Sequence, residues 1–151
     1  QMEEMRLSLG PAKGKDFANV LGPYLVTPDE LFSKIIDTPC GNKYDLNMKC
    51  FVNGELLSEG NAKDMNWTFA EIIERASYGV KLFPGDVIGS GTVGTGCLLE
   101  INGSGKRANL DYIERWIEEG DIIEMQIEGL GKISNKIVKS ESNHSILKLK
   151  K

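Results

Sequence analysis

Lys15 and Thr92 are the two residues of this sequence whose type and setting best suit chemistry. Lys15 lies between Gly14 and a strand-like segment that could hold its stem in a crowded place, so its ammonium could stabilise an enolate or a carbonyl oxygen. An ordinary surface lysine explains the same spacing. Thr92 lies between Gly91 and Gly94, where backbone amides could form a concave nest for a carboxylate. A glycine-rich β corner without any ligand accounts for these residues equally well.

The segment 83–96 is the most glycine-rich part of the chain, and its glycines spell GxGxxG. In dinucleotide-binding proteins a helix follows these glycines directly, because the pyrophosphate lies at the helix N-terminus. Here we expect strands over 87–88 and 97–101 and a turn over 102–105, with no room for a helix between them. The sequence therefore argues against a dinucleotide site.

Other catalytic or metal-binding patterns are missing from the sequence. No Glu-x-Glu pair occurs, and the one histidine, His144, lies in a lysine-rich segment over 139–151 that we interpret as a solvated tail. No Ser-His-Asp arrangement can therefore be proposed. The cysteines Cys40, Cys50 and Cys97 lack a metal-ligand spacing such as CxxC. We expect them to be reduced and mostly buried.

Composition limits the class of protein. A chain of 151 residues corresponds to about one domain and can bury a core. Its net charge of −4 makes a nucleic-acid-binding protein improbable. No apolar run is long enough to cross a bilayer, and the first residues contain no apolar signal region. We expect a cytoplasmic protein that binds neither nucleic acid nor membrane.

Short β-forming runs with closely spaced turns dominate the rest of the chain. Tyr44 to Val52 alternates like a half-buried strand, and Asn53-Gly54 is a strong hairpin signal. The segment 66–77 has a helical apolar stripe, capped by Asn66 or by a Thr68–Glu71 capping box. We further expect strands over 24–27, 55–61, 123–127 and 132–138, a helical turn within 29–36, a polar loop over 38–43, and a turn or packed loop over 110–117. This pattern predicts an α+β fold, a mixed and mainly β sandwich or roll with a few helices.

The chain begins at Gln1 inside a segment, residues 1–9, that has an amphipathic helical face. No cap or lead-in precedes this face. Two explanations fit: a natural start altered by a tag or by processing, or the back half of a longer protein.

Several segments, taken in order, resemble the signatures of one enzyme family. They are Leu9 to Phe17, Leu21-Gly22-Pro23-Tyr24-Leu25-Val26-Thr27, Val52-Asn53-Gly54-Glu55, Asp64 to Phe69, Pro84-Gly85-Asp86-Val87-Ile88-Gly89-Ser90-Gly91-Thr92, and Gly120 to Gly131. On these segments the chain resembles the fumarylacetoacetate hydrolase family. The resemblance runs from Gln1 to about Val138, which makes 1–138 the C-terminal part of that family's catalytic domain.

The resemblance implies a mixed β-roll, usually a homodimer, with a Mg²⁺ or Ca²⁺ site. It also implies that the substrates are small 2-oxo or β-diketo acids, which members of the family hydrolyse, isomerise, hydrate or decarboxylate through a metal-bound enolate. By position, Gln1 resembles a substrate-contacting glutamine and Lys15 the active-site lysine. Thr92, next to Gly91, resembles the threonine that holds the substrate carboxylate. Asn19 replaces a threonine that lies near the lysine in part of the family.

In the family the metal ligands are a Glu-x-Glu pair and an aspartate, all upstream of the position of Gln1. We therefore expect no metal ligand in this chain, poor binding of divalent metal and no turnover by the chain alone. A missing N-terminal half would complete the site. Two alternatives remain open: a non-catalytic β-fold binding or assembly subunit, and a split enzyme completed by another chain.

Overall fold

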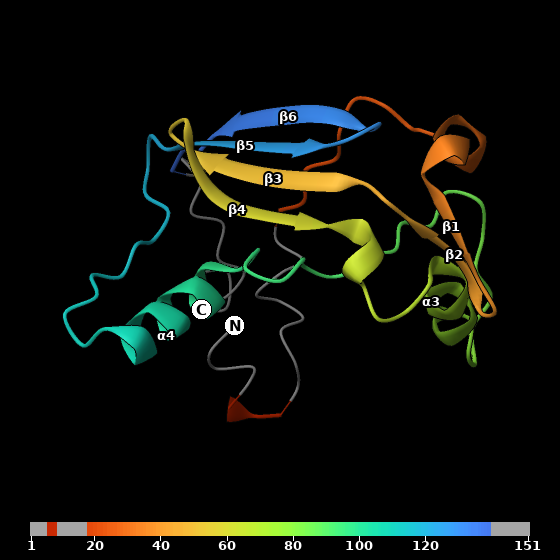
Figure 1. Cartoon of the computed structure of the whole chain (residues 1–151), viewed down its shortest axis with the longest axis horizontal. Coiled ribbons are helices and arrows are strands. Elements are labelled where there is room, and N and C mark those ends of the chain that lie inside the picture. The colour runs from red at the N-terminus through yellow and green to blue at the C-terminus, as the bar shows by residue number, and fades with distance from the viewer. Residues whose placement is uncertain (1–5, 9–17, 140–151) are drawn as a thin grey trace, which may run out of the picture.

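The computed structural model describes residues 6–8 and 18–139, which form two antiparallel sheets, two α-helices and two 3-10 helices (Figure 1). This mainly β architecture confirms the predicted fold class. Gln1, Lys15 and His144 lie outside the described residues, together with most of the predicted N-terminal helix and C-terminal tail. Among the helices described, none is long and apolar enough to span a membrane.

The main sheet has four antiparallel strands in the order β4-β3-β5-β6. They are β3 (Asn47–Val52), β4 (Glu55–Asn61), β5 (Ile122–Ile127) and β6 (Gly131–Lys136). β3 and β4 form the predicted hairpin, and its turn residues Asn53 and Gly54 have φ angles of 53° and 83°. Positive φ at both positions is what a two-residue hairpin turn requires. β5 and β6 form the second hairpin, and β5 pairs with β3 across a long separation in sequence.

A second sheet pairs β1 (Ile35–Thr38) with β2 (Gly41–Tyr44). It follows the 3-10 helix η1 (Pro28–Lys34), which confirms the helical turn predicted there. The polar loop expected over 38–43 is wrong, because these residues belong to a tight hairpin. Gly41 has a φ of 119°, which lets the chain reverse within two residues.

Other predicted strands are shortened or absent. The strand expected over 44–52 is interrupted at Asp45 and Leu46, where the chain passes from the small sheet to the main sheet. Residues 24–27 and 87–88 form no strand. β-propensity describes how well a residue fits a half-buried sheet surface, and it does not supply a neighbouring strand.

The helix α3 (Phe69–Ala76) lies within the predicted range, and its N-cap is Thr68 with the full capping box. The 3-10 helix η2 (Ala62–Asp64) follows β4 directly and leads toward α3. In Figure 1 both helices lie at the same end of the molecule as the small sheet. Thr68 fixes this arrangement, because its hydroxyl lies 2.9 Å from the Cys40 carbonyl in the β1–β2 turn.

The helix α4 (Leu98–Ala108) overturns the strand predicted over 97–101 and the expectation that no helix follows the glycines. Glycine disfavours helix, but packing decides here. Asn102 is only 1% exposed, and a Cβ at Gly105 would lie 2.5 Å from the ring of Tyr112. The helix nevertheless creates no dinucleotide fold in the described residues, because both sheets are antiparallel and no strand leads into the glycines.

One face of the main sheet carries the apolar side chains. Register places three cross-strand pairs there: Met48 with Ile127, Cys50 with Met125, and Val52 with Ile123. Val52, Leu46 and Leu31 are buried, whereas large apolar side chains such as Leu110 and Trp116 are exposed. The buried core of the described residues is therefore small, and much apolar surface is uncovered.

The cysteines are all free. Cys50 and Cys97 are half-buried, and burial raises the pKa of the Cys50 thiol. Cys40 is exposed in the β1–β2 turn, so the expectation of mostly buried thiols is wrong for this residue.

Candidate functional site

A cavity of about 400 Å³ lies between the apolar face of the main sheet and the glycine-rich segment. Its apolar wall comes from the main sheet, from the residues just before β3 and between β5 and β6, and from the segment that leads into α3: Leu46, Met48, Met65, Phe69, Ile127 and Leu130. Its polar wall is the segment 90–94 together with Asn61, Asp64 and Asn66. A mainly apolar cavity with a few polar groups is typical of a site for a small organic ligand.

Thr92 lies in the polar wall of this cavity, as does its neighbour Gly91. Gly91 has a φ of 88°, and a Cβ there would meet no atom within 4 Å, so backbone conformation is what favours glycine. Within the part of the chain that the structure describes, no group accepts a hydrogen bond from the amides of Gly91, Thr92 or Val93. These amides and the Thr92 hydroxyl are therefore donors that a carboxylate could use.

The opposite wall is positioned by the N-terminus of α3. The Thr68 side chain accepts a hydrogen bond from the Glu71 amide at 3.2 Å, and Glu71 Oε2 accepts one from the Thr68 amide at 2.8 Å. The hydrogen bonds from the Thr68 amide and hydroxyl lower the pKa of the Glu71 carboxyl. Phe69, the first residue of α3, packs edge-on against Tyr44 with ring centroids 5.9 Å apart. This packing holds the Phe69 ring where it lines the cavity.

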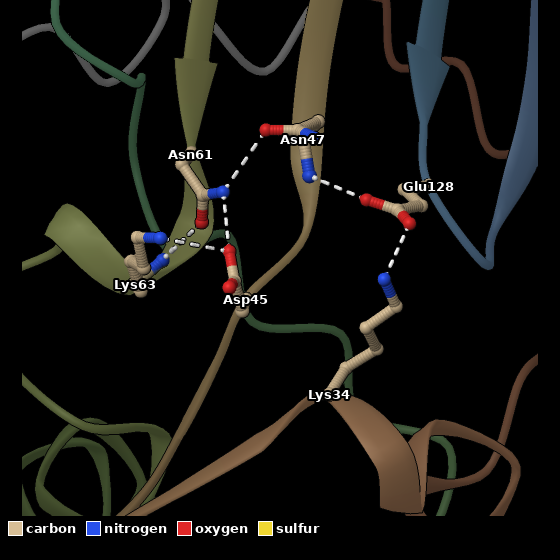
Figure 2. Close-up of polar contacts among 6 residues, drawn as sticks. All are labelled: Lys34, Asp45, Asn47, Asn61, Lys63 and Glu128. Carbon is tan, nitrogen blue, oxygen red and sulfur yellow. Dashed lines mark hydrogen bonds and ion pairs between the residues drawn. The ribbon is translucent and has the colours of Figure 1, made fainter.

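Asn61 connects the cavity to a polar network at the end of the main sheet (Figure 2). Its Nδ2 donates to Asp45 Oδ1 at 2.7 Å and to Asn47 Oδ1 at 3.1 Å. Its Oδ1 accepts from the Lys63 amide at 3.0 Å, which caps η2. The Lys63 ammonium also donates to Asp45 Oδ1, at 3.0 Å. The hydrogen bond from Lys63 lowers the pKa of Asp45 most, and the hydrogen bond from Asn61 lowers it further.

The second half of the network joins η1 to the β5–β6 turn. Glu128 accepts hydrogen bonds from the Lys34 ammonium and from the Asn47 amide (Figure 2). The hydrogen bond from the Lys34 ammonium makes the largest contribution to the lowered pKa of Glu128. Glu128 in turn raises the pKa of Lys34. Asp45 links the halves, because its amide donates to the Lys34 carbonyl at 2.8 Å. The network therefore fixes β3, β4, η1 and the β5–β6 turn next to the cavity.

The predicted site residues have different outcomes. Thr92 and Gly91 lie together in the cavity wall, while Gln1 and Lys15 lie outside the described residues. Asn19 is exposed. Sequence reasoning missed the opposite wall, where Asp64 and Asn66 lie. Both fall within the segment 64–69, which resembled the family signature, and that resemblance was the available signal.

The described residues do not form a metal site. Among residues 6–8 and 18–139, no three His, Cys, Asp or Glu side chains are grouped so that they could hold a metal ion. Asp64 is the one carboxylate among the described residues that line the cavity.

Comparison with known proteins places these features in a family. The family model described as "Fumarylacetoacetate (FAA) hydrolase C-terminal" matches residues 1–138. A 2,4-didehydro-3-deoxy-L-rhamnonate hydrolase of Sphingomonas sp. (strain SKA58) is 36% identical over 120 residues, which are 79% of this chain and 35% of that protein. A mitochondrial oxaloacetate tautomerase of Bos taurus is 33% identical over 119 residues, 78% of this chain and 31% of that protein.

Two solved structures extend the comparison. A candidate HpcE protein from Mycobacterium smegmatis superposes with a TM-score of 0.56 at 29% identity, covering 78% of this chain and 36% of that one. A maleylpyruvate hydrolase from Sphingobium sp. SYK-6, solved with manganese(II) and pyruvate, gives a TM-score of 0.53 over 80% of this chain and 35% of that one. At 24% identity, the second likeness shows the fold alone.

The chain spans about one third of the length of the curated relatives it matches. The match to the family model nevertheless covers nearly all of the chain, including the glycine-rich segment in the cavity wall. The fold, this match and the relatives agree with the resemblance seen in the sequence. The chain belongs to the fumarylacetoacetate hydrolase family, whose named relatives are hydrolases and tautomerases.

Proposed function

We propose that this chain forms part of an enzyme that acts on a small 2-oxo or β-diketo acid, and that Gly91 and Thr92 bind the substrate carboxylate. The position of Thr92 carries the proposal. Its hydroxyl and the neighbouring amides lie in the wall of a cavity of about 400 Å³, and no described residue accepts a hydrogen bond from them. Donors arranged in advance at an anionic group bind it with little reorganisation. In this proposal 1–138 is the C-terminal part of the catalytic domain and 139–151 a polar tail.

Lys15 and Gln1 complete the proposed substrate site. Lys15 is assigned the charge that stabilises an enolate oxygen, and Gln1 a polar contact to the substrate. The reaction is hydrolysis of a carbon–carbon bond, isomerisation, hydration or decarboxylation, and the hydrolase and tautomerase relatives support this range. The homodimer and the cytoplasmic location remain predictions.

A divalent cation, Mg²⁺ or Ca²⁺, would supply Lewis-acid polarisation of the substrate oxygens in the complete enzyme. The described residues do not fit such an ion, since Asp64 is their one carboxylate at the cavity. We therefore assign the metal ligands to residues other than the described ones. The manganese(II) and pyruvate in the maleylpyruvate hydrolase structure are compatible with a metal in this family. By itself the chain is proposed to bind metal poorly and to turn over no substrate.

Pyruvate, the simplest 2-oxo acid, is a direct probe of the proposed carboxylate site. In ¹H–¹⁵N spectra of the chain, titration with pyruvate should shift the amides of residues 91–94. Thr92→Val removes the hydroxyl at nearly constant volume and should weaken pyruvate binding by about tenfold or more, since a hydrogen bond to a charged group contributes ~1.5–3 kcal/mol. Ser134→Ala is the control, because Ser134 is exposed on β6. Shifts confined to another surface, or equal affinity in T92V, would reject the assignment.

A non-catalytic assembly subunit is the second candidate. The small buried core and the many exposed apolar side chains of the described residues favour it. This role predicts that the chain self-associates or captures a partner without binding pyruvate. Sedimentation of the chain with and without pyruvate, combined with the titration, separates the two candidates.

A further inference from the structure

Gly60 lies in β4 where the glycine-rich segment approaches the main sheet. A Cβ at Gly60 would lie 2.3 Å from Val93 Cγ2, well inside contact distance. Gly60 is not among the glycines with positive φ, so backbone conformation does not require glycine here. The close approach of the Val93 side chain favours glycine instead, which is a recognised reason for glycine within a strand.

Ser58, two residues earlier in β4, contacts the same segment beyond Val93. Ser58 is 5% exposed, and its Oγ lies 3.1 Å from Thr95 Oγ1. Thr95 has a φ of 67°, an unusual conformation for a β-branched residue. The Thr95 amide also donates to Glu100 Oε2 in α4, at 3.2 Å. Strained residues persist where the surrounding structure holds them, and such sites often have a function.

We propose that Gly60 and Ser58 form a socket on β4 that seats Val93 and Thr95 and thereby positions Thr92 at the cavity. The socket is the gap left by the absent Cβ of Gly60 together with the Ser58 hydroxyl. Both are positioning residues, because they act through the glycine-rich segment. Their consequence for substrate binding rests on the proposed function of Thr92.

The position of Thr92 depends on its neighbours in the chain. Its hydroxyl and amide have no hydrogen-bond partner among the described residues, whereas Val93 next to it is locked against β4. A methyl at Gly60 would require Val93 Cγ2 to move from 2.3 Å to about 3.4 Å, where ordinary contact begins, whereas Val93 Cβ already lies at 3.5 Å. The proposal requires part of this displacement to reach the backbone of Val93 and so Thr92, and a misplacement of about 1 Å can cost up to about 100-fold at a reacting group.

Amide hydrogen exchange at Gly96 tests the socket without any ligand, because the Gly96 amide donates to the Val93 carbonyl at 2.8 Å. Gly60→Ala should speed this exchange by about tenfold, the expected cost of one extra methyl in a packed site. Gly89→Ala is the matched control, since a Cβ there meets nothing within 4 Å. Exchange in the β3–β5 ladder verifies that each variant is folded.

The double variant Gly60→Ala/Val93→Ala provides the sharpest comparison. Without its γ-methyls, residue 93 keeps only the Cβ, which lies 3.5 Å from a Cβ at residue 60, an ordinary contact. Exchange at Gly96 should therefore return close to the rate of Val93→Ala alone. Unchanged exchange in G60A, or no recovery in the double variant, would overturn the socket.

Titration of the same variants with pyruvate tests the positioning of Thr92. G60A should weaken pyruvate binding by about tenfold or more, the double variant should recover part of the loss, and G89A should match the wild type. Equal affinity in G60A despite faster exchange would refute the positioning role. If the unaltered chain binds no pyruvate, the proposed function fails, and the exchange experiment still decides whether the socket exists.

Discussion

Replacing Thr68 by valine should destabilise the protein through loss of hydrogen bonds alone. Valine keeps the volume and the branched shape of threonine, which matters because Thr68 is 2% exposed. The hydroxyl accepts from the Glu71 amide at 3.2 Å, and it lies 2.9 Å from the Cys40 carbonyl and from Glu71 Oε2. The hydroxyl has a single proton, so it donates to only one of these two oxygens at a time.

The expected cost of T68V is about 2 kcal/mol. Loss of an N-cap side chain contributes ~1 kcal/mol, and loss of the hydrogen bond to the Cys40 carbonyl contributes ~1 kcal/mol. For a chain of this size, this corresponds to a fall in melting temperature of roughly 4–8 °C. Thermal unfolding followed by circular dichroism measures it.

Thr27→Val is the matched control for this prediction. Thr27 is the N-cap of η1, is exposed, and makes no side-chain capping hydrogen bond. An exposed substitution of this kind should change stability by less than about 0.5 kcal/mol. If T68V melts no lower than T27V, the hydrogen bonds of the Thr68 hydroxyl are not what caps α3 and holds it against the β1–β2 turn.

Two further predictions concern the polar network and the loop after α4. Asp45 and Glu128 have lowered pKa values in the folded state, so their stabilisation is present above the unfolded pKa and is lost as pH falls from about 5 to about 3. The free energy of unfolding, measured with urea, should therefore fall less across this pH range in Lys34→Met/Lys63→Met than in the exposed control Lys136→Met. An equal fall in both variants would contradict the network. Asn102 donates to the Arg115 carbonyl at 2.8 Å and accepts from the Arg115 amide at 3.1 Å, so Asn102→Ala should speed trypsin cleavage after Arg115 by about tenfold. Ser104→Ala on the exposed side of α4 should be cleaved at the wild-type rate, and equal rates in all three proteins would show that Asn102 does not hold this loop.

Local signals in the sequence determined the β3–β4 hairpin and offered the cap that α3 uses, but they did not predict the β1–β2 hairpin. Asn53-Gly54 requires no tertiary contact to form its turn, since both residues accept positive φ. The capping box of Thr68 and Glu71 is likewise contained within four residues. The alternation along Tyr44 to Val52 predicted which face of β3 is apolar, and the order of motifs predicted the family.

Tertiary structure alone decided the elements whose formation depends on distant partners. α4 contains Gly103 and Gly105, and it forms because Asn102 and Gly105 pack against the loop that follows. Residues 24–27 have strand propensity, but they have no strand to pair with.

In the candidate site, too, some features were visible in the sequence and others were set only by the tertiary structure. Spacing and family resemblance indicated Thr92 and Gly91, because a glycine-rich segment with hydroxyls is visible in the sequence. The cavity wall opposite, the network around Asn61 and the seating of Val93 on Gly60 were not visible. Each depends on the distance between atoms of segments far apart along the chain, which only the folded backbone sets.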